Sequence, residues 1–220
     1  MSTGICDLPE GSRRRVFFYR DYRFFTGGHL KVWHYYCHTL SSPKHDASLF
    51  LTPSSTLESE NPWQQEALLS PWCPDQADVL FLAGLDWQAV DSSCHVPVIN
   101  LIQHVRHAHP NDPRFAFLSR PATRICVSPA VADAILASGR VNGPVHVIAN
   151  GLDLSVFPSA AAVKDIPILL VGMNDPFLAS ELSAMLHQRG VDHVLQSKSL
   201  PRPEFLTLLG RSRLVVLLPS

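Results

Sequence analysis

The sequence predicts an α/β fold, in which helices cover parallel β-sheets, and three observations lead to this prediction. Short apolar segments rich in aromatic and β-branched residues alternate along the chain with segments whose apolar residues have helical spacing. The apolar segments are continuous runs, as is typical of strands buried on both faces. The alternation stops after residue 153 and starts again near residue 166, which indicates a second unit of the same kind.

The first part of the chain supplies a sheet and two helices. Gly27-Gly28 opens a helix that is expected over Leu30–Leu40. Ser128-Pro129 caps a second helix, expected over Ala130–Ser138, because Ser is a favoured N-cap and Pro fits the first turn. The expected strands are Arg15–Tyr19, Ala47–Leu51, Asp78–Leu82, Pro97–Ile102, Arg124–Val127 and Val145–Ile148.

The second part repeats the pattern on a smaller scale. Strands are expected at Ile166–Gly172, Val191–Gln196 and Leu214–Leu218, and helices at Pro176–Gly190 and Pro203–Gly210. We therefore predict a Rossmann-like parallel-sheet domain over residues 1–155, a linker over 156–165 and a partial Rossmann-like domain over 166–220. Because the last strand stops where its C-terminal loop would start, we expect this second unit to be the first half of a domain.

Composition excludes several classes of protein. The net charge of −1 and the isoelectric point near 6.8 give no electrostatic reason to expect nucleic acid as a partner. The five cysteines are far apart and form no Cys-x-x-Cys, so we expect reduced thiols, with neither a disulfide framework nor a zinc ribbon. The segment Met1–Gly11 lacks the apolar core of a signal peptide, and no run approaches the roughly 20 apolar residues of a membrane span. The expectation is a cytoplasmic protein.

The first segment that could carry chemistry is Phe25-Thr26-Gly27-Gly28-His29, between a strand and a helix. Two glycines let the backbone approach a ligand closely, and the free N–H groups at the start of a helix attract anions such as phosphate. The alternative is a purely structural Gly-Gly turn.

The second segment is Gln103-His104-Val105-Arg106-His107-Ala108-His109, directly after the fourth strand. Polar residues at the carboxyl end of a buried strand are where α/β enzymes hold their ligands, and a histidine there can donate to substrate oxygens or shuttle a proton. The three histidines raise the alternative of a metal site. Their spacing on a loop matches no zinc pattern and no nearby cysteine or acid completes it, so we expect no metal.

The third segment combines Val127-Ser128-Pro129 with Val147–Asp153. Together with the other segments it resembles the two-domain nucleotide-sugar glycosyltransferases of the GT-B fold, above all the large retaining family numbered four. The matching motifs, in the family's order, are Gly27-Gly28, Ile102-Gln103-His104, Val127-Ser128, Val147–Asp153 with Phe157, Val171-Gly172 and Pro219-Ser220.

The resemblance implies a function and roles for single residues. The protein would be a glycosyltransferase (hexosyltransferase-like) that moves a sugar from a nucleotide sugar to a saccharide, lipid-linked or small-molecule acceptor, with no cofactor and no metal. His104 would lie beside the transferred sugar as the catalytic residue. Gly27, Gly28, His29 and Gly172 would contact the substrate or its diphosphate, and Asn150 and Gly151 would form the hinge. A lipid acceptor would bring one face of the protein to the inner side of a membrane.

The chain departs from the family pattern at two places. Met173–Phe177 stands where the family has a basic pair, and the sequence ends at Ser220, before the position at which the family has an E-x7-E segment. We therefore expect the chain as given to be truncated before that segment, with an incomplete donor site, and to bind UDP or GDP weakly or not at all.

A different class of function stays open beside the enzyme. The chain could be a non-catalytic relic of such an enzyme that binds a glycan or a partner protein. An unrelated α/β enzyme is less well supported: no Gly-x-Gly-x-x-Gly follows the first strand, as an epimerase would require, and no nucleophilic Cys or paired Asp occupies a loop suited to a phosphatase.

Overall fold

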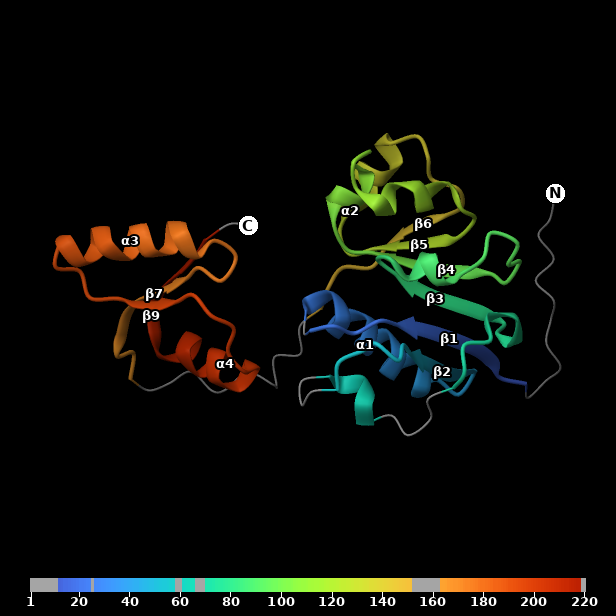
Figure 1. Cartoon of the computed structure of the whole chain (residues 1–220), viewed down its shortest axis with the longest axis horizontal. Helices are drawn as coiled ribbons and strands as arrows, with labels where there is room; N and C mark the ends of the chain where they lie inside the picture. Colours follow the sequence, from blue (N-terminus) through green and yellow to red (C-terminus); the bar gives the residue numbers. More distant parts are fainter. Residues whose placement is uncertain (1–11, 25, 58–60, 66–69, 152–162, 219–220) are drawn as a thin grey trace. The chain divides into compact units, whose positions relative to one another are not determined.

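The computed structural model describes residues 12–24, 26–57, 61–65, 70–151 and 163–218 of the chain. The chain divides into two compact units, Met1–Asn150 and Gly151–Ser220. Each unit is an α/β structure built on a parallel sheet (Figure 1). Most of the predicted linker, 156–165, lies outside the described residues, as do Phe157, Pro219 and Ser220.

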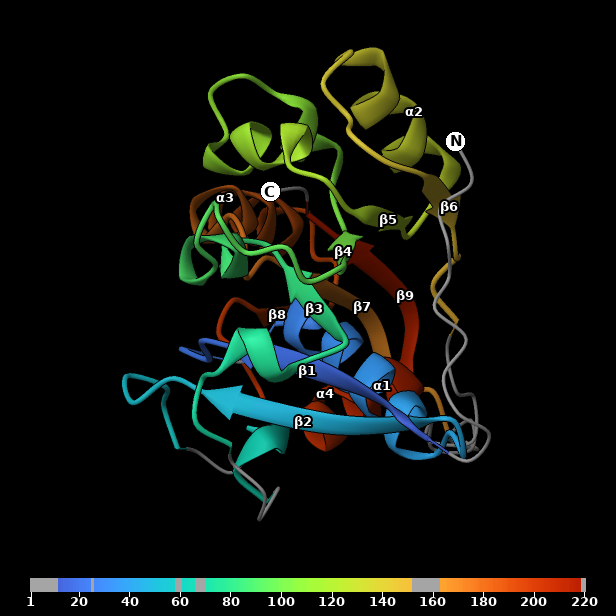
Figure 2. The same cartoon turned by 90° about the vertical axis from the view of Figure 1, so that its right-hand side faces the viewer.

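In the described part of the first unit, six strands form one parallel sheet. The strands are β1 (Arg14–Arg20), β2 (His45–Leu51), β3 (Val79–Ala83), β4 (Val98–Ile102), β5 (Thr123–Cys126) and β6 (Val145–Val147). Their order across the sheet is β2-β1-β3-β4-β5-β6, and all neighbours run parallel. The same order is seen from a second direction in Figure 2.

The sheet is buried on both faces, as the continuous apolar runs predict. Successive side chains of a strand point to opposite faces, so Phe17 and Phe18 of β1 enter two different cores. Phe18 stacks on Phe81 of β3, with ring centroids 4.8 Å apart, and meets Tyr36 edge to face. On the opposite face, Phe17 packs among Leu80, Leu82 and Trp87. Burial of these aromatic groups supplies much of the driving force that holds the sheet together.

In the part of the first unit that the structure describes, two α-helices and five short 3-10 helices connect the strands. Helix α1 (Gly27–Leu40) follows β1 and buries Val32 and Tyr36, and α2 (Pro129–Ala137) follows β5 and buries Val131 and Ile135. The 3-10 helices are η1 (Pro62–Gln65), η2 (Pro74–Gln76), η3 (Asp86–Ala89), η4 (Val105–Ala108) and η5 (Pro113–Ser119). They occupy segments for which the sequence predicted no regular structure.

The strand order reverses its direction at β1. The chain goes outward from β1 to β2 and then returns past β1 to β3, after which β4, β5 and β6 follow outward on the other side. At such a reversal the two connections leave the sheet toward opposite faces, which opens a crevice at the carboxyl ends of the two strands. The end of β1 and the end of β3 are therefore where a ligand is expected.

The second unit has a three-stranded parallel sheet, in the order β8-β7-β9, in its described part. Its elements are β7 (Ile166–Val171), α3 (Pro176–Gln188), β8 (Val194–Gln196), α4 (Arg202–Arg211) and β9 (Ser212–Leu217). Asp175 caps α3 by accepting a hydrogen bond from the backbone N–H of Leu178, and Ile166, Leu169 and Val171 form the buried centre of the sheet.

The structure confirms the predicted α/β class and its parallel, Rossmann-like sheets. Each predicted strand and helix has a counterpart, with α1 starting at Gly27 rather than Leu30 and β8 shortened to Val194–Gln196. Within the described residues, Cys73, Cys94 and Cys126 are free thiols. None of the helices in this part of the chain has the length and apolar character needed to cross a bilayer.

Candidate functional site

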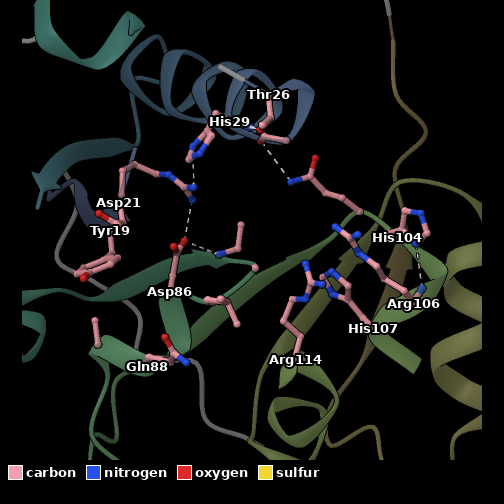
Figure 3. A pocket seen from close by; sticks show the side chains of 17 residues that line it. Tyr19, Asp21, Thr26, His29, Asp86, Gln88, His104, Arg106, His107 and Arg114 are labelled. Atoms are coloured by element: carbon pink, nitrogen blue, oxygen red, sulfur yellow. Dashed lines mark hydrogen bonds and ion pairs between the residues drawn. The ribbon is translucent and has the colours of Figure 1, made fainter. Parts of the chain in front are cut away.

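A cavity of about 660 Å³ lies at the carboxyl ends of β1, β3 and β4 in the first unit. It therefore occupies the reversal point of the sheet, where α/β folds bind ligands. Its walls come from the end of β1, the start of α1, the turn after β3 and the segment after β4. The residues are Tyr19, Arg20, Asp21, Thr26, Gly28, His29, Ala83, Gly84, Leu85, Asp86, Gln88, Ala89, Gln103, His104, Arg106, His107 and Arg114 (Figure 3).

The start of α1 forms one wall of the cavity. Thr26 is the N-cap, and its hydroxyl accepts a hydrogen bond from the backbone N–H of His29 at 3.2 Å. The side chain of Gln103 donates to the backbone carbonyl of Gly28 at 3.3 Å and so joins this wall to the segment after β4. A Cβ atom at Gly28 would lie 3.4 Å from Gln103 Nε2. This is ordinary van der Waals contact with the end of a flexible side chain, so the approach of Gln103 does not by itself require glycine.

A buried ion pair lies between the ends of β1 and β3. Arg20 Nη1 donates to Asp86 Oδ2 at 2.7 Å, and both side chains are less than a tenth exposed. The same carboxylate oxygen accepts from the backbone N–H of Ala83 at 2.8 Å. Gly84 makes this contact possible, because its φ of +59° turns the chain back toward the strand.

The other nitrogen of the Arg20 guanidinium fixes His29. Arg20 Nη2 lies 3.0 Å from His29 Nδ1, and because arginine can only donate, Nδ1 is the acceptor. Burial, and then the positive charge of Arg20, lower the pKa of His29 to about 4. His29 is therefore neutral at pH 7, with its proton on Nε2.

The pKa of Asp86 is raised to about 6 by burial, while Arg20 and the Ala83 N–H act to lower it. The carboxylate is thus ionised at neutral pH and balances Arg20. We interpret the Arg20–Asp86–His29 group as a rigid support for the cavity, because its charges are paired with each other.

His104 lies on the opposite wall, directly after β4. Its Nδ1 accepts a hydrogen bond from the backbone N–H of Arg106 at 3.0 Å. In the neutral ring the proton is then on Nε2, so His104 offers a hydrogen-bond donor to a ligand rather than a lone pair to a proton. The side chain is exposed and lines the cavity, so a ligand can reach it.

Three cationic or basic side chains after β4 form a group beside His104. Arg114 donates to Asp112 from both Nε and Nη2, with Nε 2.6 Å from Oδ1. Arg106 Nε lies 4.0 Å from Asp112 Oδ2, beyond hydrogen-bonding distance. His107 is buried, and its pKa is lowered to about 4 by burial and by Arg114.

The predicted site residues divide between the two units. Gly28, His29 and His104 line the same cavity, and Gly27 stands next to Gly28 at the start of α1. Gly172 lies in the second unit, at the end of β7, and a Cβ there would be 2.1 Å from the Cβ of Ala179. This close contact with α3 explains why the position is occupied by glycine. The role of Gly172 toward a diphosphate stays a prediction.

Asn150 and Gly151 lie at the boundary between the two units, which falls between them. Their role as a hinge stays a prediction. His104 and His107 line the cavity, whereas His109 does not. Among the residues that the structure describes, no group of three or more His, Cys, Asp or Glu side chains is placed to hold a metal ion.

Arg20, Asp86 and Arg114 line the cavity but were not predicted from the sequence. Arg20 and Asp21 follow an apolar strand directly, which is the same signal that pointed to Gln103 and His104, so it could have been found. Asp86 and Arg114 carry no comparable signal. They reach the cavity through the turn after β3 and through η5, neither of which has a recognisable sequence pattern.

A second cavity, of about 600 Å³, lies near the amino ends of β4 and β5. Arg120 lines it, but its guanidinium donates to the backbone carbonyls of Trp87, Val90 and Asp91. This end of a parallel sheet is not where α/β folds place their ligands. The cavity at the carboxyl ends is therefore the candidate site.

Comparison with known proteins adds no family to this picture: no family model matches the chain, and no curated protein is detectably similar to it.

Proposed function

We propose that the protein is a nucleotide-sugar glycosyltransferase of GT-B architecture. The first unit would lie on the acceptor side and the second on the donor side, and a sugar would pass from a nucleotide sugar to a saccharide, lipid-linked or small-molecule acceptor. The observation that carries the proposal is that Gly28 and His104, far apart in the sequence, line one cavity at the reversal point of the sheet. This is the arrangement that the resemblance requires.

The geometry of the cavity supports a specific role for each of these residues. The Nε2–H of His104 would donate to a hydroxyl of the transferred sugar or of the acceptor, because Nδ1 is held by the Arg106 N–H. The start of α1 has no acidic residue in its first turn, so its positive end can face the negative charge of a leaving diphosphate. Stabilisation of this charge lowers the barrier to an oxocarbenium-like transition state without the need for a metal.

In this proposal, Gly172 of the second unit would lie next to the diphosphate. Asn150 and Gly151 would form the hinge. Support for the donor role comes from its strand order, because β7 also lies at a reversal, between β8 and β9. Gly172 directly follows β7 and thus stands at the expected ligand end of that sheet.

The test is the release of nucleoside diphosphate by the purified product of the whole reading frame, measured with UDP-, GDP- and ADP-sugars and a panel of saccharide and polyol acceptors. We expect turnover with at least one donor, and we expect His104→Ala to lower kcat about 100-fold, as loss of one transition-state hydrogen-bond donor does.

His109→Ala is the matched control. His109 Nδ1 also accepts from a backbone N–H two residues later, that of Asn111 at 3.2 Å, but His109 lies outside the cavity. Equal activity of His104→Ala and the wild type would remove His104 from the mechanism. Saccharide binding without release of any nucleoside diphosphate would favour the non-catalytic binding protein instead.

A further inference from the structure

We infer that the cavity of the first unit binds a phosphate group of its ligand through Arg106, with Arg114 and the histidines beside it. The inference deepens the proposed function and rests on it for the identity of the ligand, which would be a phosphorylated acceptor or the diphosphate of the donor. Figure 3 shows Arg106, His107 and Arg114 grouped on one side of the cavity, across from Asp86 and His29.

Among the described residues, Arg106 has no hydrogen-bonded counter-charge, and its one ion pair is a long contact of Arg106 Nε with Asp112 Oδ2 at 4.0 Å. Among the residues that the structure describes, two acidic side chains line the cavity, those of Asp21 and Asp86. Asp86 is paired with Arg20 at 2.7 Å, and Asp21 with Arg23 at 2.9 Å. Neither carboxylate is therefore available to neutralise Arg106.

The nearest carboxylate to Arg106, that of Asp112, is already occupied. Arg114 takes both of its oxygens, and Arg106 Nε stays 4.0 Å from Oδ2. Among the described residues, two guanidinium groups thus share one carboxylate. The surplus positive charge lies at the mouth of the cavity, where the Arg106 side chain is 59% exposed.

The chemistry of these groups favours phosphate. A guanidinium presents a planar fork of N–H donors that fits two oxygens of a phosphate, and hydrogen bonds between charged groups are about twice as strong as neutral ones. The Nε2–H of His104 adds a neutral donor on the same wall. A phosphate monoester, with two charges and three free oxygens, uses more of these donors than a carboxylate can.

Arg106 is also the residue best suited to a test. Arg114 is only 19% exposed and holds Asp112, so its replacement would risk the fold of η5. Arg106 is exposed and makes no side-chain hydrogen bond within the described residues, so Arg106→Ala should fold normally. Arg15 supplies a matched control at the amino end of β1: its side chain is 58% exposed and its Nε is 3.8 Å from Asp78 Oδ2.

The experiment is isothermal titration calorimetry of the 220-residue chain with glucose 6-phosphate, inorganic phosphate, UDP and, as the uncharged comparison, glucose. We expect glucose 6-phosphate to bind, glucose to give no binding signal, and UDP to bind weakly or not at all because the donor site is incomplete. Arg106→Ala should weaken the binding of glucose 6-phosphate at least about tenfold. Arg15→Ala should bind like the wild type, and Arg106→Lys should be intermediate because it keeps the charge but loses the fork.

Each outcome has a defined meaning. Binding of glucose 6-phosphate alone assigns the phosphate to the acceptor, and binding of UDP alone assigns it to the donor. The inference is overturned if no phosphate compound binds, or if Arg15→Ala weakens binding as much as Arg106→Ala does. Because the titration needs no turnover, failure of the glycosyltransferase proposal is seen separately, in the release of nucleoside diphosphate.

Discussion

The buried pair of Arg20 and Asp86 gives the most direct test of how the cavity is built. We predict that Asp86→Asn destabilises the first unit by about 4 kcal/mol at pH 7. The structure sets this magnitude: the pair is hydrogen-bonded at 2.7 Å and less than a tenth exposed. Two charges about 4 Å apart attract by about 4 kcal/mol at an effective dielectric constant near 20, and loss of one partner of a buried pair usually costs about 3–5 kcal/mol.

The two halves of the pair should differ when one is removed. Asp86→Asn leaves a buried guanidinium that cannot lose its proton. Arg20→Met leaves a carboxyl group whose pKa is already raised to about 6 by burial, so it can become neutral instead. We expect Arg20→Met to cost less than Asp86→Asn at pH 7. The loss of stability in Arg20→Met, relative to the wild type, should become smaller toward pH 5. A carboxyl group with a raised pKa in the folded state contributes stability at low pH that is lost as the pH rises, and removal of Arg20 raises the pKa of Asp86 further.

Urea unfolding, monitored by tryptophan fluorescence, measures this loss of stability in the first unit alone. The tryptophans are Trp33, Trp63, Trp72 and Trp87, and all of them lie in the first unit. Arg15→Met is the control, because the exposed pair of Arg15 and Asp78 should contribute at most about 1 kcal/mol. The reasoning is refuted if Asp86→Asn costs no more than Arg15→Met, or if the double variant Arg20→Met/Asp86→Asn loses the full sum of the two single losses.

Two further predictions concern acid stability and the second unit. Burial lowers the pKa of His29 and His107 to about 4, so the stability they contribute is complete above their ordinary value of 6.5 and is lost as the pH falls from 6.5 toward 4. The raised pKa of Asp86 has the opposite effect on stability between pH 3.8 and 6. Near pH 5.5 the unfolded state therefore binds about one proton more than the folded state, and the free energy of unfolding changes by up to about 1.4 kcal/mol per pH unit. Urea midpoints at pH 7, 6 and 5 measure this pH dependence. An unchanged slope in His107→Gln would contradict its assignment to the buried histidines. In the second unit, Gly172→Ala should cost about 1–3 kcal/mol, because its Cβ would lie 2.1 Å from that of Ala179. Hydrogen exchange of β7 amides measures this loss, and Ala179→Gly should restore part of it; no rescue would mean that packing does not explain Gly172.

Part of the candidate site could be predicted from its position relative to strands and helices. His104 closely follows β4, and Gly28 lies at the start of the helix that follows β1; the carboxyl ends of parallel strands meet at one edge of the sheet. Arg20 has the same position but was not recognised. Its partner Asp86 could not be found in this way, because the contact depends on the left-handed turn at Gly84 and on the neighbouring position of β1 and β3.

The sequence alone determined the α/β class, the order of the elements along the chain and the division into two similar units. These features depend on local patterns of apolar residues, caps and turns, which each segment carries within itself. Only the tertiary structure decided that β1 pairs with both β2 and β3, and that the Arg20–Asp86 pair and the Arg106–Arg114 group face one cavity. Strand order and the pairing of charges depend on contacts between distant segments, and no local sequence pattern predicts such contacts.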